Sequence, residues 1–287
     1  AAPDDPDSEL TFKGVVFNEM KGALSSPVQR LGQALQQRMF PTTTYHHNSG
    51  GDPEAIPDLT YQQLKAFHAR HYHPSNAVFL TYGDIPAAEH QAHFETKALA
   101  QFQAISLDLA IPDERRYAAP ISDLVYYPLD GAEDCGDKTH IVIGWLLGPI
   151  TDPMASLRAR LLSDVLLDNS SSPLRHALET SEYGAAPSPL CGFDASTREA
   201  TLVCGLEGSN PEHADAVEQR VISVLKHVAA DGISSGAVDS ALHQLELSER
   251  EITGDGFPYG LRLLMEALTP AIHGGDALTA LDSDPLL

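Results

Sequence analysis

Strand-like segments that alternate with amphipathic helical segments place the strongest constraint on how this chain can fold. Apolar, β-rich runs span residues 138–147, 188–193 and 200–206, and a polar turn separates the last two. Two such runs joined by a short turn predict an antiparallel hairpin. Strands followed by pairs of helices favour an α+β fold in which helices pack on one face of a largely antiparallel sheet.

Helix start signals recur along the sequence. Ser26-Pro27 has an N-cap residue before a first-turn proline, and an apolar stripe follows it to Met39. Thr60 and Gln63 have the spacing of a capping box, and the helix that they start must end near Tyr72. Further helices are predicted to begin at Pro153 (capped by Asp152), Pro173, Pro211 and Ser235.

The remaining segments suggest how the chain divides into domains. Asn76–Tyr82 has the composition of a strand buried on both faces, and a short helix is predicted over Ala87–Phe102. Residues 105–125 have little periodicity, two prolines and a charged run, which is typical of a linker. We therefore expect one domain within 1–104 and a second within 126–287.

Length and composition set the broad class of protein. The chain has 287 residues, 43% of them hydrophobic, which is enough to bury the cores of two medium domains. Its most apolar stretch, 141–147, is far shorter than the roughly 20 residues of a membrane-spanning helix, so we expect a soluble protein with no membrane partner. With no initiator methionine or targeting segment in view, we expect an internal piece of a longer polypeptide and assign no compartment.

Charge argues against a nucleic-acid partner. Forty acidic and eighteen basic residues give a formal net charge of -22, which repels phosphate backbones and anionic lipid. A solvated acidic surface that favours solubility is one interpretation. Attraction of basic peptides is the other.

Most local catalytic motifs are absent from the sequence. It contains no Gly-x-Ser-x-Gly elbow and no glycine-rich phosphate loop, which disfavours a serine hydrolase of that type and a nucleotide-binding protein. Cys135, Cys191 and Cys204 are odd in number and lack Cys-x-x-Cys spacing, so we expect ordinary buried thiols.

Clusters of histidine and glutamate are the remaining candidates for a metal site. No His-Glu-x-x-His or His-x-x-Glu-His sequence occurs, so no complete catalytic zinc motif is encoded. We interpret two clusters as packing or surface groups. They are His68, His71, His73, His90 and His93, and Glu246, Glu249 and Glu251.

One run of residues resembles a known family. Lys13–Gly22, which reads Lys-Gly-Val-Val-Phe-Asn-Glu-Met-Lys-Gly, is similar to the helix that bears the distal metal ligand in the presequence-protease branch of the pitrilysin/insulinase zinc metallopeptidases. The resemblance continues in order through Ser49-Gly-Gly-Asp-Pro53, Tyr72-His-Pro-Ser-Asn76 and Tyr82-Gly83-Asp84. It is weaker in the second half, through motifs such as Gly205-Leu206-x-Gly208.

The resemblance implies a fold, a cofactor and one site residue. Members of this family have repeated α+β domains of the mitochondrial-processing-peptidase type, which enclose a chamber for unfolded peptides of modest length. Two histidines and a distant glutamate hold one zinc ion, and Glu19 matches that glutamate. The histidines and the general base are expected outside this sequence, so the resemblance assigns no catalytic residue here and implies that the chain alone binds zinc poorly and is inactive.

Two other interpretations stay open. A non-catalytic relative would keep the fold and the acidic surface as a peptide-binding or assembly subunit without a working zinc motif, whereas the family resemblance itself implies that the remaining domains of the same polypeptide are partners of this chain. An acidic interaction module would require the matching motifs to maintain only the fold. Substrate-binding residues are not assigned by any of the three interpretations.

Overall fold

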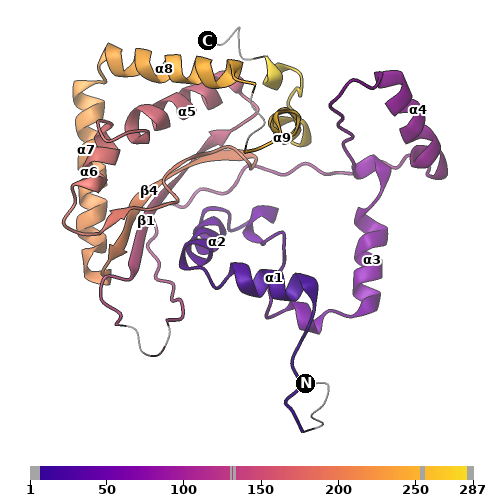
Figure 1. Ribbon diagram of the computed structural model, residues 1–287, viewed down its shortest axis with the longest axis horizontal. Helices are drawn as coiled ribbons and strands as arrows, with labels where there is room; N and C mark the ends of the chain where they lie inside the picture. Colours follow the sequence, from indigo (N-terminus) through magenta and orange to yellow (C-terminus); the bar gives the residue numbers. More distant parts are fainter. Residues whose placement is uncertain (1–6, 130, 132–133, 253–255, 283–287) are drawn as a thin grey trace. The chain divides into compact units, whose positions relative to one another are not determined.

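The computed structural model describes residues 7–129, 131, 134–252 and 256–282, and it divides into two compact units (Figure 1). The first unit comprises residues up to 72 together with 115–133, and the second comprises 73–114 and 134–287. The expected linker, 105–125, is thus shared between the units. The expected domain limits at 104 and 126 stay a prediction.

The second unit is built on a four-stranded antiparallel sheet. β1 (Thr139–Pro149) and β4 (Glu199–Ser209) are its long strands, while β2 (Ala186–Pro187) and β3 (Gly192–Asp194) both pair with the other edge of β4. Ile143 lies opposite Cys204 in the β1–β4 register. The predicted α+β class and the β3–β4 hairpin are therefore confirmed.

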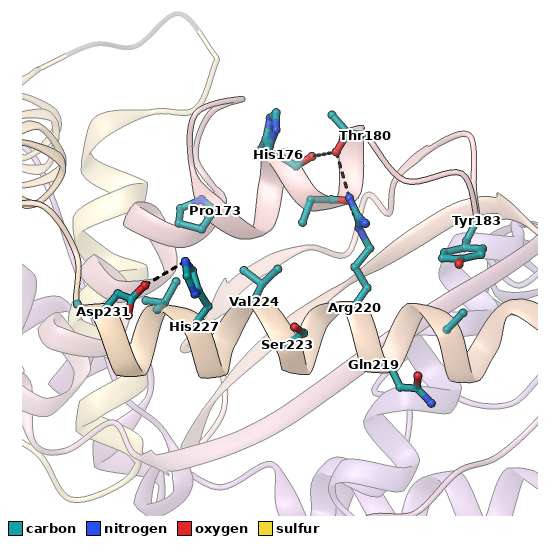
Figure 2. A pocket seen from close by; sticks show the side chains of 14 residues that line it. Pro173, His176, Thr180, Tyr183, Gln219, Arg220, Ser223, Val224, His227 and Asp231 are labelled. Atoms are coloured by element: carbon teal, nitrogen blue, oxygen red, sulfur yellow. Dashed lines mark hydrogen bonds and ion pairs between the residues drawn. The ribbon is translucent and has the colours of Figure 1, made fainter.

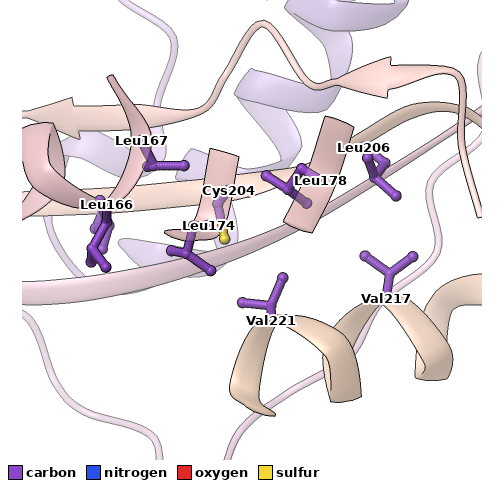
Figure 3. Close-up of a cluster of buried hydrophobic side chains, with 9 residues drawn as sticks. Leu166, Leu167, Leu174, Leu178, Cys204, Leu206, Val217 and Val221 are labelled. Carbon is purple, nitrogen blue, oxygen red and sulfur yellow. The ribbon is translucent and has the colours of Figure 1, made fainter. Parts of the chain in front are cut away.

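Helices cover one face of this sheet, as predicted. Every second residue of β4, at 202, 204 and 206, contributes to a buried apolar cluster, as expected where one face of a strand packs on helices. The helices are α5 (Pro153–Leu167), α6 (Pro173–Glu179) and α7 (Ala214–Asp231), and Figure 3 shows their leucines and valines around Cys204. The cluster consists of Leu166, Leu167, Leu174, Leu178, Leu202, Cys204, Leu206, Val217 and Val221.

The packing of β1 on β4 explains the glycine at position 205, the first residue of the Gly205-Leu206-x-Gly208 motif. A Cβ at this position would overlap the carbonyl oxygen of Ile141 and lie 2.7 Å from the Cα of Val142. Both obstacles are backbone atoms of β1, which cannot rotate away as a side chain would. The close approach of β1 and β4 therefore requires glycine at this position.

Two more helices of the second unit follow α7 in the sequence. α8 (Ser235–Arg250) packs against α5, and α9 (Tyr259–Ile272) is followed by a short 3-10 helix. The ring of Tyr82 meets that of Tyr259 edge-on at 6.1 Å, so residues 73–114 contact the start of α9.

The first unit contains helices with little buried surface. α1 (Val15–Ala23), α2 (Pro27–Met39) and α3 (Tyr61–His71) contain no buried residue. Ser26 accepts a hydrogen bond from the backbone of Gln29, and the predicted capping box of Thr60 and Gln63 forms in both directions. Two ties hold residues 115–133 to α2, since Arg30 donates to the carbonyl of Tyr126 and Arg38 pairs with Asp123.

Two secondary-structure predictions require correction. A 3-10 turn at Pro74–Asn76 replaces the start of the strand expected at Asn76–Tyr82, and its remaining residues pair with no strand in the described chain. A strand forms only when a neighbour supplies its hydrogen-bond partners. The helix expected over Ala87–Phe102 ends at Lys97 as α4 (Ala87–Lys97).

Within the ranges that the structure describes, no helix combines the length and the hydropathy needed to cross a bilayer.

Candidate metal-binding site

Glu19 projects from α1, whose local structure follows from the residues at its ends. Gly14 precedes the helix in an extended conformation, and the helix ends where the amide of Leu24 bonds to the carbonyls of Met20 and Gly22. The hydroxyl of Ser25 also donates to the carbonyl of Gly22, at 2.6 Å. A short turn therefore joins α1 to the capped start of α2, which fixes α1 at its C-terminal end.

The helix has a packed side and an open side. Phe17, Met20 and Leu24, spaced three and four residues apart, are half-buried. A Cβ on Gly50 would overlap the thioether sulfur of Met20, so the glycine lets this loop approach the helix closely. The amide of Gly50 donates to the side chain of Asn48 at 2.8 Å, which fixes the loop in turn.

The open side carries the carboxylate among apolar neighbours. Val15 and Val16, one turn before Glu19, are 75% and 54% exposed, and Glu19 itself is exposed. Val15 and Val16 therefore place exposed apolar surface beside this carboxylate.

A zinc ion fits this position in donor type but not in donor number. Carboxylate oxygen and histidine nitrogen are ordinary zinc ligands, and catalytic sites use three protein ligands with one open position. Within the described residues, no group of three histidine, cysteine, aspartate or glutamate side chains is placed to hold a metal. Glu19 can therefore supply one ligand of a set whose other members lie outside the described part of the chain.

Four of the five histidines singled out from the sequence, His68, His71, His73 and His90, lie against aromatic rings. His68 stacks on Tyr72 at 4.6 Å between ring centroids, and His71 lies 4.4 Å from Phe67. His73 accepts a hydrogen bond from the amide of Ser75. These contacts agree with packing and surface roles for the cluster.

Glu249 of α8 takes part in a junction between helices that sequence spacing did not reveal. Glu249 binds Arg160 of α5 at 3.2 Å across 89 residues of sequence. Glu266 of α9 lies nearby, and burial raises its pKa although Arg262 and Arg160 oppose the rise.

The expectation that the three cysteines are buried holds for only some of them. Cys204 is buried and Cys191 is half-buried, whereas Cys135 is exposed. Cys135 lies in the loop before β1, next to the turn at Gly136 and Asp137, where the chain runs on the surface.

A groove of about 800 Å³ lies between α6 and α7 (Figure 2). Arg220 extends from α7 and donates to the carbonyl of Ala177 at 2.7 Å and to the hydroxyl of Thr180 at 3.2 Å. The guanidinium thus satisfies the C-terminal end of α6, where a cation is also favoured by the helix dipole. Arg220 therefore joins α6 to α7.

Comparison with known families gives one extensive match. Residues 58–245 match the family described as the peptidase M16 inactive domain. Glu19 lies before this range.

Known relatives extend the similarity over nearly the whole chain. The mitochondrial presequence protease of Xenopus tropicalis is 37% identical over 280 residues, which cover 97% of this chain and 27% of that protein. The chloroplastic/mitochondrial presequence protease 1 of Arabidopsis thaliana is 33% identical over 288 residues, which cover 99% of this chain and 26% of that protein. The chain thus spans about a quarter of the length of these relatives.

A solved structure shares the fold. The crystal structure of a peptidase M16 inactive domain from Pseudomonas fluorescens superposes with a TM-score of 0.64 at 18% identity, over 90% of this chain and 58% of that one.

Proposed function

This chain belongs to the peptidase M16 inactive-domain family, and from that premise we propose that it forms part of a zinc-dependent metalloendopeptidase that degrades unfolded peptides of modest length. The observation that carries the proposal is the carboxylate of Glu19, held on a helix whose open side is apolar. Catalysis itself is assigned to residues of the longer polypeptide.

Glu19 is the residue of this chain that would hold the metal. Bound zinc would activate a water molecule for attack on a peptide carbonyl by lowering the pKa of that water. The contribution of this chain is positional, because Phe17 and Met20 pack one side of α1 while the turn at Gly22–Ser25 fixes its end. A helix that is held at these points limits the movement of its carboxylate.

The remaining domains of the same polypeptide are the proposed partners of the first unit. Its helix α3 exposes Tyr61, Leu64 and Phe67 by 58% to 69%, which leaves an apolar surface without cover in the described chain. Relatives about four times as long offer the polypeptide needed to bury such surface. Burial of these side chains would favour association by the hydrophobic effect.

The proposed substrates are unfolded peptides, with basic peptides favoured. A net charge of -22 attracts cationic peptides over a range set by ionic strength, and it disfavours nucleic acid. Cleavage of basic peptides by the longer polypeptide should therefore slow as salt is added, more than cleavage of neutral peptides does.

The inactive character of the matched family favours a second candidate function. Residues 58–245, about two thirds of the chain, match a domain described as inactive. This chain would then serve as a non-catalytic peptide-binding or assembly subunit, and Glu19 would have no metal to bind.

Substitution of Glu19 in the longer polypeptide distinguishes the two candidates. Glu19→Gln keeps the size of the side chain and removes the anionic ligand, so we expect loss of bound zinc and at least about a hundredfold loss of peptide cleavage. Glu54→Gln is the matched control, because Glu54 is also an exposed carboxylate of the first unit. Unchanged zinc content and cleavage in Glu19→Gln would overturn the metalloendopeptidase proposal.

The 287-residue chain provides a complementary measurement. With one proposed ligand, it should bind zinc only weakly when titrated alone. One tightly bound zinc ion per chain would show that this chain contains a complete site of its own.

A further inference from the structure

Two cysteines flank the pairing of β3 with β4 in the second unit, because Cys191 immediately precedes β3 and Cys204 lies within β4. Gly192 pairs with Val203 and Phe193 with Leu202, so the same register one residue earlier places Cys191 opposite Cys204. Cys204 belongs to the buried apolar cluster drawn in Figure 3, and Cys191 packs against that cluster. The two side chains therefore approach the same part of the core from neighbouring segments.

The hydrogen bonds of β4 indicate the kind of pair that they form. The carbonyls of Gly205 and Glu207 turn toward the β2–β3 side, where they accept from Ser188 at 2.9 Å and from Ala185 at 2.8 Å. Because these directions alternate along a strand, the backbone groups of Cys204 turn the other way, toward β1. Cys191 and Cys204 thus occupy a non-hydrogen-bonded position, where opposite Cα atoms lie about 4.5 Å apart.

This spacing suits a disulfide bond. Cα atoms of bonded cysteines usually lie about 4.4–6.8 Å apart. The thiol of Cys191 donates to the carbonyl of Gly205 at 3.5 Å, so its sulfur already lies at the backbone of the residue after Cys204.

The acidities of the thiols also indicate that they are neighbours. Burial raises the pKa of Cys191, and burial together with the nearby Cys191 raises the pKa of Cys204 to about 12. Both groups are therefore protonated thiols near neutral pH, and their exchange reactions should be slow.

We propose that Cys191 and Cys204 are a thiol pair that a low-molecular-weight disulfide, such as glutathione disulfide, converts into an intramolecular disulfide bond. Cys191, the more accessible of the two, loses its proton and attacks one sulfur of the oxidant, which breaks that S–S bond and releases one glutathione thiol. Cys204 then loses its proton and attacks the sulfur of Cys191, which releases the second glutathione thiol. Two protein thiols are oxidised, one disulfide is reduced, and both protons end on glutathione.

The bond would tie the segment between β2 and β3 to the central strand. It would close a short loop that includes β3 and the turn into β4. Cross-links of this kind stabilise mainly by restricting the unfolded chain, so oxidation should raise the unfolding temperature by several degrees.

Intact-mass measurement of the Cys135→Ser chain tests the proposal. This variant removes the exposed thiol and leaves only the pair. After incubation with glutathione disulfide, we expect a mass about 2 Da lower, two thiols that no longer react with an alkylating agent after unfolding, and one cross-linked peptide containing both positions.

Single substitutions in the same background provide the control. Cys135→Ser combined with Cys191→Ser, or with Cys204→Ser, should lose no mass by oxidation, and at most one glutathione should attach. The proposal is overturned if the Cys135→Ser chain gains two glutathiones, or if both of its thiols remain reactive after treatment that fully oxidises an unfolded sample.

Discussion

The two units of this chain differ in how their helices are stabilised. Helices of the second unit enclose leucines and valines that are almost fully buried against β4. Among the described residues of the first unit, Phe40 and Thr43 are buried, while α3 exposes its large apolar side chains. The second unit therefore carries a core of its own, and the first has the surface expected of a segment that needs further polypeptide to complete its core.

Truncation of one leucine in each unit should give the largest difference in stability between the two units. Leu174 is fully buried in the second unit, so Leu174→Ala should lower the free energy of unfolding by about 2–5 kcal/mol. Leu64 is 61% exposed in the first unit, and Leu64→Ala should change it by no more than about 0.5 kcal/mol. Urea unfolding of the two variants measures both values, and equal losses would refute the contrast.

Addition of one methyl group to a glycine should change the stability of the fold in opposite directions in the two units. Gly205→Ala would force β1 and β4 apart and should cost about 1–3 kcal/mol. At Gly22, in α1, a Cβ meets nothing within 4 Å, so Gly22→Ala should stabilise the helix by up to about 1 kcal/mol. Thermal unfolding with circular dichroism reports both changes, and a loss of stability in Gly22→Ala would indicate that this side of α1 is already in contact.

Removal of a helix cap should distinguish a packed helix from an exposed one. Thr60 caps α3 and Asp152 caps α5, and alanine at either position should cost about 1 kcal/mol. Since α5 also contributes to the core, Asp152→Ala should leave its amides protected, whereas Thr60→Ala should expose the first turns of α3. Hydrogen exchange followed by mass spectrometry measures this difference, and equal protection would contradict it.

One carboxylate in each unit should give the smallest and most specific effect, a pH dependence of opposite sign. Burial raises the pKa of Glu266, so its folded form binds protons more tightly, and stability should fall as pH rises above its ordinary value of 4.5. A hydrogen bond from Arg38 lowers the pKa of Asp123 below its ordinary value of 3.8. The ionised carboxylate therefore stabilises the folded chain, and this stabilisation should be lost as the pH falls below 3.8.

Paired variants isolate these contributions. Glu266→Gln should reduce the fall in the free energy of unfolding above pH 4.5, and Asp123→Asn should reduce its fall below pH 3.8. Stability measured by urea unfolding from about pH 3 to about pH 7 gives both slopes. Unchanged slopes in both variants would show that neither carboxylate has the stated environment.

Local signals predicted much of the secondary structure. Asp152-Pro153, Ser26-Pro27 and Thr60–Gln63 each start a helix where expected, because capping depends on neighbours within three residues. The β3–β4 hairpin was predictable for the same reason. Asn76–Tyr82 failed as a strand because pairing needs a partner segment that its own composition cannot supply.

Contacts between distant residues were not predictable from spacing. Asp113 belongs to a charged run that resembles an exposed linker, yet it pairs with Arg198, 85 residues away, and the amide of Glu114 donates to the buried carboxylate of Glu199. These contacts hold residues 113–114 in the second unit, while Arg38 holds Asp123 in the first. The proposed metal ligand, Glu19, was identified only through the resemblance, since an exposed glutamate on a helix has no local feature that distinguishes a ligand from a surface carboxylate.

Location of zinc by anomalous X-ray scattering, in crystals of the longer polypeptide that contains this chain, tests the central proposal most directly. We expect one zinc ion with a carboxylate oxygen of Glu19 about 2.0–2.2 Å away and nitrogen ligands from residues outside this chain. A zinc ion whose ligands do not include Glu19, or no zinc within reach of α1, would contradict the account.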